Sequence, residues 1–86
     1  MTEILYTKTF LKRYKKLDSD FQEDIKDKIE LFKDKKNHER LKVHKLKGKY
    51  KGFLSFSINR KDRILFQFIK GNSAIFLDID DHDIYR

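Results

Sequence analysis

The spacing of apolar residues changes once along this chain, and the change restricts what the chain can fold into. Between residues 9 and 32, apolar side chains recur every three or four positions, as they do along one side of an amphipathic helix. From residue 54 onward they recur every second position, as they do in a strand with one buried face. The order of the two patterns predicts an α+β domain with helices first and an antiparallel sheet afterwards.

The first half of the chain is expected to hold a short strand at 4–7 and then two helices. The first helix begins near Thr9, and a break at 18–20 separates it from the second. Ser19 and Gln22, three residues apart, fit a capping box at the start of the second helix. Because the break is short, the helices should form an antiparallel helical hairpin. Its apolar stripes consist of Phe10, Leu11, Tyr14 and Leu17, then Phe21, Ile25, Ile29 and Phe32.

The second half predicts an antiparallel β-meander of about three strands, with the helices covering one face. Turn residues at 59–62 and 70–72 separate the strands. Ser55, Ser57 and Arg63 alternate with the apolar residues, so they should line an open concave surface on the other face. The alternating apolar residues are Leu54, Phe56 and Ile58, then Ile64, Phe66 and Phe68, then Ile75, Leu77 and Ile79.

Length and composition favour one small domain spanning residues 1–86. Eight Phe and four Tyr can supply its core, although 41% of the residues are charged. The absence of cysteine excludes a disulfide framework and a thiolate metal site. No apolar run is long enough to span a membrane, and the chain starts with no apolar signal segment. We therefore expect a cytoplasmic protein with no membrane association.

Positive charge is concentrated in the middle of the chain. The net charge is +7, and between Arg40 and Arg63 nine basic residues face a single acid, Asp62. Within His44–Gly52, four lysines alternate, so an extended backbone would place all four on one face. Such a surface favours a nucleic-acid partner over a basic surface kept only for solubility. The residues expected to contact RNA are Lys45, Lys47, Lys49, Lys51, Arg60 and Lys61.

Five residues are candidates for acid–base chemistry on RNA: His44, Asp62, Arg63, His82 and Tyr85. His44 precedes the lysines and His82 lies among aspartates, so the two imidazoles have contrasting surroundings, as an acid–base pair requires. Arg63 offers a planar cation for a phosphoryl oxygen, and Tyr85 a ring that can stack on a base. RNA carries its own nucleophile, the 2′-hydroxyl. The acidic stretch at 80–83 lacks the spacing of a calcium loop, so we expect no metal and no cofactor.

The motifs in this sequence resemble the RelE/ParE toxin superfamily, and within it the YafQ and RelE ribonucleases. The resemblance lies in His44-Lys-Leu-Lys-Gly48, Lys51-Gly52, Asp62-Arg-Ile-Leu-Phe66 and His82-Asp-Ile-Tyr85, and it covers essentially the whole chain. It implies a RelE-like microbial ribonuclease-type fold, with a four-stranded antiparallel sheet and a helical hairpin. It also implies a cognate antitoxin and cleavage of mRNA in the ribosomal A site.

The resemblance also implies roles for the five candidate residues. His44 and Asp62 match a functional histidine and acid of the YafQ-like branch. Arg63 matches the arginine that RelE-like members use on the phosphate, His82 the C-terminal catalytic histidine, and Tyr85 lies near a catalytic or stacking aromatic. The expected function is therefore ribosome-dependent, metal-independent mRNA cleavage that leaves a 2′,3′-cyclic phosphate and a 5′-hydroxyl.

Two alternatives remain open. The first is a ParE-type inhibitor that binds DNA gyrase without enzymatic activity. The second is a catalytically degenerate relic that retains only antitoxin or nucleic-acid binding. This second alternative arises because Ser57 and Ile58 stand where the YafQ-like branch carries a further histidine.

Overall fold

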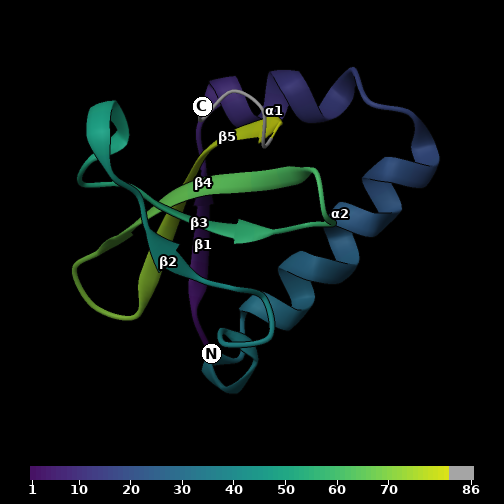
Figure 1. The fold of residues 1–86 in the computed structure, drawn as a ribbon. Coiled ribbons are helices and arrows are strands. Elements are labelled where there is room, and N and C mark those ends of the chain that lie inside the picture. The colour runs from purple at the N-terminus through teal and green to yellow at the C-terminus, as the bar shows by residue number, and fades with distance from the viewer. Residues whose placement is uncertain (82–86) are drawn as a thin grey trace.

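The computed structural model describes residues 1–81, in which a five-stranded sheet and two α-helices form the fold (Figure 1). The strands lie in the order β1-β5-β4-β3-β2. β1 runs parallel to β5, and the other neighbouring strands are antiparallel. The elements are β1 (Glu3–Tyr6), α1 (Lys8–Lys15), α2 (Ser19–Phe32), η1 (Lys35–Asn37), β2 (His44–Lys45), η2 (Gly48–Tyr50), β3 (Leu54–Ser57), β4 (Asp62–Ile69) and β5 (Ser73–Asp81).

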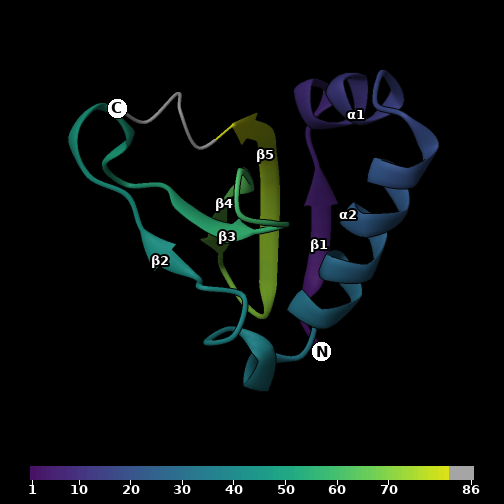
Figure 2. The same cartoon turned by 45° about the vertical axis from the view of Figure 1, so that its right-hand side comes forward.

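The predicted α+β class, with an opening strand, two helices and then a meander, is confirmed. Both helices lie on one side of the sheet, and β2 lies at the edge far from them (Figure 2). α1 crosses the end of β5, and α2 then runs along the sheet, so the two helices diverge from the break between them (Figure 1). No helix within the described residues is long and apolar enough to cross a membrane.

The implied four-stranded antiparallel sheet is wrong in two respects. The first strand enters beside the last one in parallel, where Glu3 N donates to Asn72 O at 2.8 Å. In addition, His44 and Lys45 pair with Ser55 and Leu54 and form a short fifth strand. Parallel pairing across seventy residues leaves no local sequence signal, because it depends on where the two helices return the chain.

Side chains cap the N-terminal ends of α1 and α2. Thr7 caps α1 by accepting from Phe10 N at 3.1 Å, and its hydroxyl also contacts the carbonyl oxygens of Phe76 and Leu77 on β5. The capping box predicted at Ser19 is wrong, since Asp18 is the N-cap and its Oδ1 accepts from Phe21 N at 2.9 Å. A carboxylate at this position also favours the positive end of the helix dipole.

The C-terminal end of α2 is closed by the segment that follows it. Asn37 Nδ2 donates to Leu31 O at 3.0 Å, and His38 Nε2 lies 2.8 Å from Phe32 O. The His38 ring also stacks on Phe32 with centroids 4.6 Å apart. His38 is thus part of the structure that closes the helix end. It satisfies a helix-end carbonyl that would otherwise need water.

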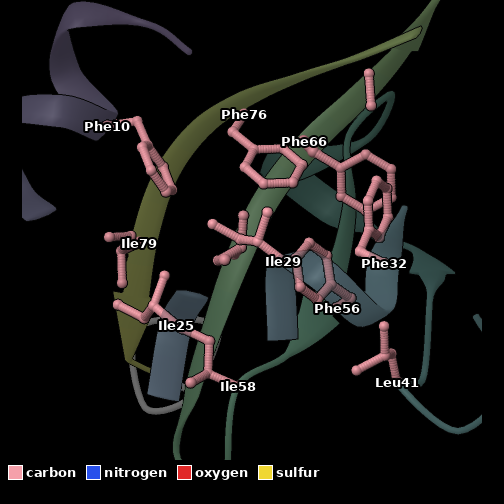
Figure 3. Close-up of a cluster of buried hydrophobic side chains, with 12 residues drawn as sticks. Phe10, Ile25, Ile29, Phe32, Leu41, Phe56, Ile58, Phe66, Phe76 and Ile79 are labelled. Carbon is pink, nitrogen blue, oxygen red and sulfur yellow. The ribbon is translucent and has the colours of Figure 1, made fainter. Parts of the chain in front are cut away.

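The core lies between α2 and the sheet and is built largely of phenylalanine rings (Figure 3). Phe32 of α2 stacks on Phe56 at 4.6 Å and meets Phe66 edge to face at 4.9 Å. Phe76 continues the cluster toward Phe10 of α1 at 5.6 Å. Each ring contributes about 1.5–3 kcal/mol on burial. The packed rings hold β3, β4 and β5 rigidly, so the opposite face of these strands has fixed geometry.

Candidate nucleic-acid interface

The sheet face away from α2 carries two rows of side chains across the strands. Strand register aligns His44, Ser55, Leu65 and Asp78 in one row. The second row, two residues further along β3, consists of Ser57, Arg63 and Asp80. Residues paired in register point to the same face, so Ser55, Ser57 and Arg63 lie on one face as predicted. The open surface expected there is wrong for Ser55, which is 0% exposed, whereas Ser57 and Arg63 are half-buried.

Arg63 occupies the centre of the second row. It is half-buried, between Ser57 on β3 and Asp80 on β5, and Asp80 is 8% exposed. Side chains directly opposite on antiparallel strands have Cβ atoms about 5 Å apart, so the carboxylate of Asp80 lies beside the guanidinium-bearing side chain. A planar cation held in this way is oriented before any ligand arrives.

Arg63 also lines a surface hollow of about 640 Å³ at the edge of β3. The floor is made partly by the loop at 40–42, where Leu41 O accepts from Ser57 N at 2.8 Å. Five of the described lining residues are cationic and none is acidic. We call this site the cationic hollow; its lining is Lys28, Arg40, Leu41, Lys42, Ser57, Ile58, Asn59, Arg60 and Arg63. Five cations lining one hollow, with Asp80 as the acid beside Arg63, favour a phosphate group or a nucleic-acid backbone as the ligand.

Asp62 lies at the end of the β3–β4 turn. Its Oδ2 accepts from Asn59 Nδ2 at 3.0 Å, while Asn59 Oδ1 accepts from the backbone N–H groups of Lys61 and Asp62. These bonds give Asp62 a structural task in closing the turn. They also help to shape the rim of the cationic hollow, since Asn59 belongs to its lining.

His44 is exposed and contacts a lining residue of the cationic hollow through one ring nitrogen. Its Nδ1 is 2.8 Å from the carbonyl oxygen of Lys42, which lines the cationic hollow. A carbonyl can only accept, so Nδ1 carries the hydrogen and Nε2 of the neutral ring carries the lone pair. Lys42 has a φ of 59°, an unusual value for a residue with a side chain, and this bend turns its carbonyl toward the imidazole. In its neutral form the ring therefore presents Nε2 as the proton acceptor.

The lysine segment, residues 44–52, is not the extended strip that the alternation of its lysines predicted. Only His44 and Lys45 are in a strand, and Gly48–Tyr50 form a turn of 3₁₀ helix. Gly48 and Gly52 have φ values of 67° and 97°, which residues with a Cβ seldom adopt, so the chain turns at both glycines. The four lysines therefore do not share one face. Lys45, Lys47 and Lys51 instead line a separate hollow of about 550 Å³.

The structure brings some of the expected site residues together and leaves others undescribed. Arg60 and Arg63 meet in the cationic hollow, with His44 at its rim. Lys49 Nζ lies over the Tyr50 ring at 5.3 Å, outside that hollow. His82 and Tyr85 lie outside the described residues. The sequence did not single out Lys28, Arg40 or Lys42, and only the general excess of base between residues 40 and 63 pointed to the last two.

Comparison of the sequence with protein-family models finds no match, and comparison with curated proteins finds none either. Comparison of the structure with solved structures finds clear neighbours. A YoeB/ParE toxin from Agrobacterium tumefaciens aligns with a TM-score of 0.65 at 21% identity, over 94% of this chain and 99% of the other. The toxin–antitoxin complex RelBE2 from Mycobacterium tuberculosis gives a TM-score of 0.70 at 17% identity, over 94% and 98%. The chain has the RelE/YoeB-type toxin fold.

YafQ from Escherichia coli shares this fold as well, with a TM-score of 0.66 at 15% identity over 98% of this chain and 97% of the other. The expected fold, with its helices on one side of a sheet, is thus confirmed by proteins of nearly the same length. Identities of 15–21% show a common fold. The residues of the site, not the fold, decide the function.

Proposed function

We propose that this protein is the toxin of a toxin–antitoxin pair and that it cleaves mRNA on the ribosome. The observation that carries the proposal is the cationic hollow around Arg63, on a fold shared with YoeB, RelE and YafQ proteins. The hollow offers several cations to a phosphate backbone, and His44 at its rim offers a proton acceptor. The antitoxin is supported by the RelBE2 neighbour, which is a toxin–antitoxin complex.

The proposed chemistry uses the 2′-hydroxyl of RNA as the nucleophile. His44 Nε2 takes the 2′-hydroxyl proton, the 2′-oxygen forms a bond to the adjacent phosphorus, and the bond to the 5′-oxygen breaks. His82 gives a proton to that leaving oxygen, and Tyr85 stacks on a neighbouring base. The products are a 2′,3′-cyclic phosphate and a 5′-hydroxyl.

Arg63 stabilises the charge that develops on the phosphorane. In the sheet register, His44 and Arg63 are two strands apart and two residues offset, which separates their Cα atoms by about 12 Å. Two inward-reaching side chains can meet across that distance at one phosphodiester. His44 is favoured over Asp62 as the base because the Asp62 carboxylate already accepts a hydrogen bond in the turn. Lys45 and Lys47 remain candidates for contacts to the neighbouring backbone.

The deciding experiment is a translation reaction programmed with a defined mRNA, in which new RNA 5′ ends are mapped by primer extension. Wild type should create ribosome-dependent 5′ ends, and His82→Ala should reduce them by about 10²–10⁴-fold. Equal cleavage by the two proteins would reject the role of His82. No cleavage by either, in a reaction where a known ribonuclease toxin works, would reject the proposed function. A DNA supercoiling assay then distinguishes a gyrase inhibitor from a binding-only relic.

A further inference from the structure

A separate hollow lies in the loop that joins β2 to β3, at the edge of the sheet far from both helices (Figure 2). Its volume is about 550 Å³, within the usual range of pockets that hold small molecules. Its described lining contains three lysines and no acidic residue. We call this site the lysine hollow; it is lined by residues 45–48, 51–52 and 54.

The floor of the lysine hollow is apolar. Lys45 pairs in register with Leu54, and Leu54 with Phe66, so these side chains point to the face of the sheet that carries the core. Leu54 packs against the core cluster and is half-buried, as is Leu46. The three lysines of the lining are exposed. The hollow therefore combines two half-buried leucines with three cations that reach into solvent.

Hydrogen bonds shape the loop around this hollow before any ligand arrives. Leu46 N donates to Phe53 O at 2.9 Å, and Gln67 Nε2 of β4 donates to Gly52 O at 3.2 Å, which ties the loop to the sheet. Apart from adjacent residues, no atom of the described chain lies within 4 Å of the place that a Cβ would take at Gly48 or Gly52. A ligand can therefore approach the backbone closely at both glycines. A hollow formed in advance costs its ligand little reorganisation.

The lining selects a ligand that has a flat apolar part and a dense group of negative charges. A small inorganic anion would leave the leucines uncovered, and an uncharged apolar compound would leave the ammonium groups unneutralised. A nucleotide has both parts, since its base has an apolar face and its phosphates are anionic. An RNA nucleotide carries one charge on its phosphodiester. A terminal phosphate alone carries about −1.5 to −2 at pH 7, and a nucleoside triphosphate has two further charged phosphates. Three lysines in one loop thus favour the free triphosphate.

We propose that the lysine hollow binds a nucleoside triphosphate, with its base on the two leucines and its phosphates on the three lysines. Leucine side chains form no hydrogen bonds with base edges, so adenine and guanine nucleotides should bind alike. The lysine hollow and the cationic hollow share no described lining residue and lie at opposite ends of β3. A bound triphosphate therefore leaves Arg63 open but occupies Lys45 and Lys47. Only its competition with RNA for these two lysines rests on the proposed function.

The test measures fluorescence anisotropy of adenosine triphosphate labelled on its ribose, with the purified full chain. Binding should saturate, and unlabelled adenosine triphosphate and guanosine triphosphate should displace the probe equally well. Inorganic triphosphate and adenosine each carry only one of the two parts that the lining recognises. Each should therefore compete at least about tenfold more weakly than adenosine triphosphate.

Variants separate the cations of the hollow from its floor. Lys47→Gln with Lys51→Gln removes two lining cations and should weaken triphosphate binding at least about tenfold. Lys49→Gln with Lys70→Gln is the matched control, because it removes the same charge from exposed lysines outside the described lining. It should weaken binding less than about threefold, since salt screens charges that make no contact. Leu46→Ser should weaken adenosine triphosphate but leave inorganic triphosphate unchanged, a difference that a general loss of fold would not produce.

Several outcomes overturn the proposal. These are no saturable binding by wild type, inorganic triphosphate that competes as well as adenosine triphosphate, or an equal loss in the control pair. A dinucleoside monophosphate, which carries a single phosphodiester, that competes equally well would make an RNA nucleotide the occupant. The assay contains no ribosomes and no mRNA. Triphosphate binding without mRNA cleavage would therefore overturn the proposed function alone, and cleavage without triphosphate binding would overturn this inference alone.

Discussion

The imidazole of His44 is held by a single contact, from Nδ1 to the carbonyl oxygen of Lys42 at 2.8 Å. His44→Asn keeps a donor close to the position of Nδ1 but removes the nitrogen that would accept the proton. We expect cleavage to fall by about 10²–10⁴-fold. The melting temperature should change little, because the residue is exposed and its backbone-anchoring bond is retained. Single-turnover cleavage rates and thermal unfolding measure the two effects.

If His44→Asn instead destabilised the whole fold, its melting temperature would fall and its cleavage rate would recover on cooling. Unchanged cleavage in a folded variant would transfer the role of base to Asp62. Asp62→Asn then becomes the next variant, since its amide oxygen can still accept from Asn59 in the turn.

The phenol of Tyr6 makes the stability of the fold depend on pH in the alkaline range. Its pKa is raised above 10.0, chiefly because burial removes the phenol from water, while Lys33 opposes the shift. Since the unfolded chain loses this proton first, the stabilising effect is fully present below pH 10.0 and is lost as pH rises through the folded-state pKa. As pH rises from 10.0 toward the folded-state pKa, the melting temperature of wild type should therefore fall more steeply than that of Tyr6→Phe. Parallel melting curves in alkaline buffers would contradict this assignment.

At the scale of the element, the end of α2 depends on the residues of η1 and just after it. His38→Ala removes a hydrogen bond to Phe32 O and a ring stacked on Phe32. Together these losses should cost about 2 kcal/mol, or ~10 °C in melting temperature for a domain of this size. Thermal unfolding followed by circular dichroism measures the change. Cleavage per folded molecule should stay at the wild-type level, and a loss of cleavage at low temperature would show that His38 has a role beyond structure.

The elements themselves were predictable where local spacing decides them. The apolar stripe from Phe21 to Phe32 and the alternation from Leu54 to Ile79 both correspond to observed elements. The predictions failed where partners distant in sequence decide. β1 pairs in parallel with β5. The N-cap of α2 was missed for a local reason, since Asp18, one residue before Ser19, accepts from Phe21 N. The prediction for the lysine segment failed for another reason. Gly48 and Gly52, both with positive φ, turn the backbone, so the alternating lysines do not form an extended strand.

At the scale of the whole molecule, the cationic hollow could be predicted only in part. The sequence indicated Arg63 and Arg60, and the resemblance added a role for Arg63. Lys28 enters from α2 and Arg40 from the loop that borders β3, so both reach the site through the tertiary fold. The sequence shows how many basic residues the chain has, but not which of them lie together in the folded protein.

The salt dependence of RNA binding can show whether RNA responds to the cations gathered in the cationic hollow or to the net charge of the protein. Lys28→Gln together with Arg40→Gln removes two cations from the cationic hollow. If both contact phosphates, the slope of log K against log salt for a single-stranded RNA oligomer should become shallower by about 1.4. The matched control is Lys12→Gln with Lys16→Gln, which removes the same charge from the exposed surface of α1. It should reduce affinity modestly and leave the slope nearly unchanged, because distant charges act through a screened field rather than by releasing counterions. Anisotropy titrations between about 50 and 200 mM salt measure both pairs. Equal slopes for the two double variants would mean that RNA responds to the overall charge of the protein and not to the hollow around Arg63.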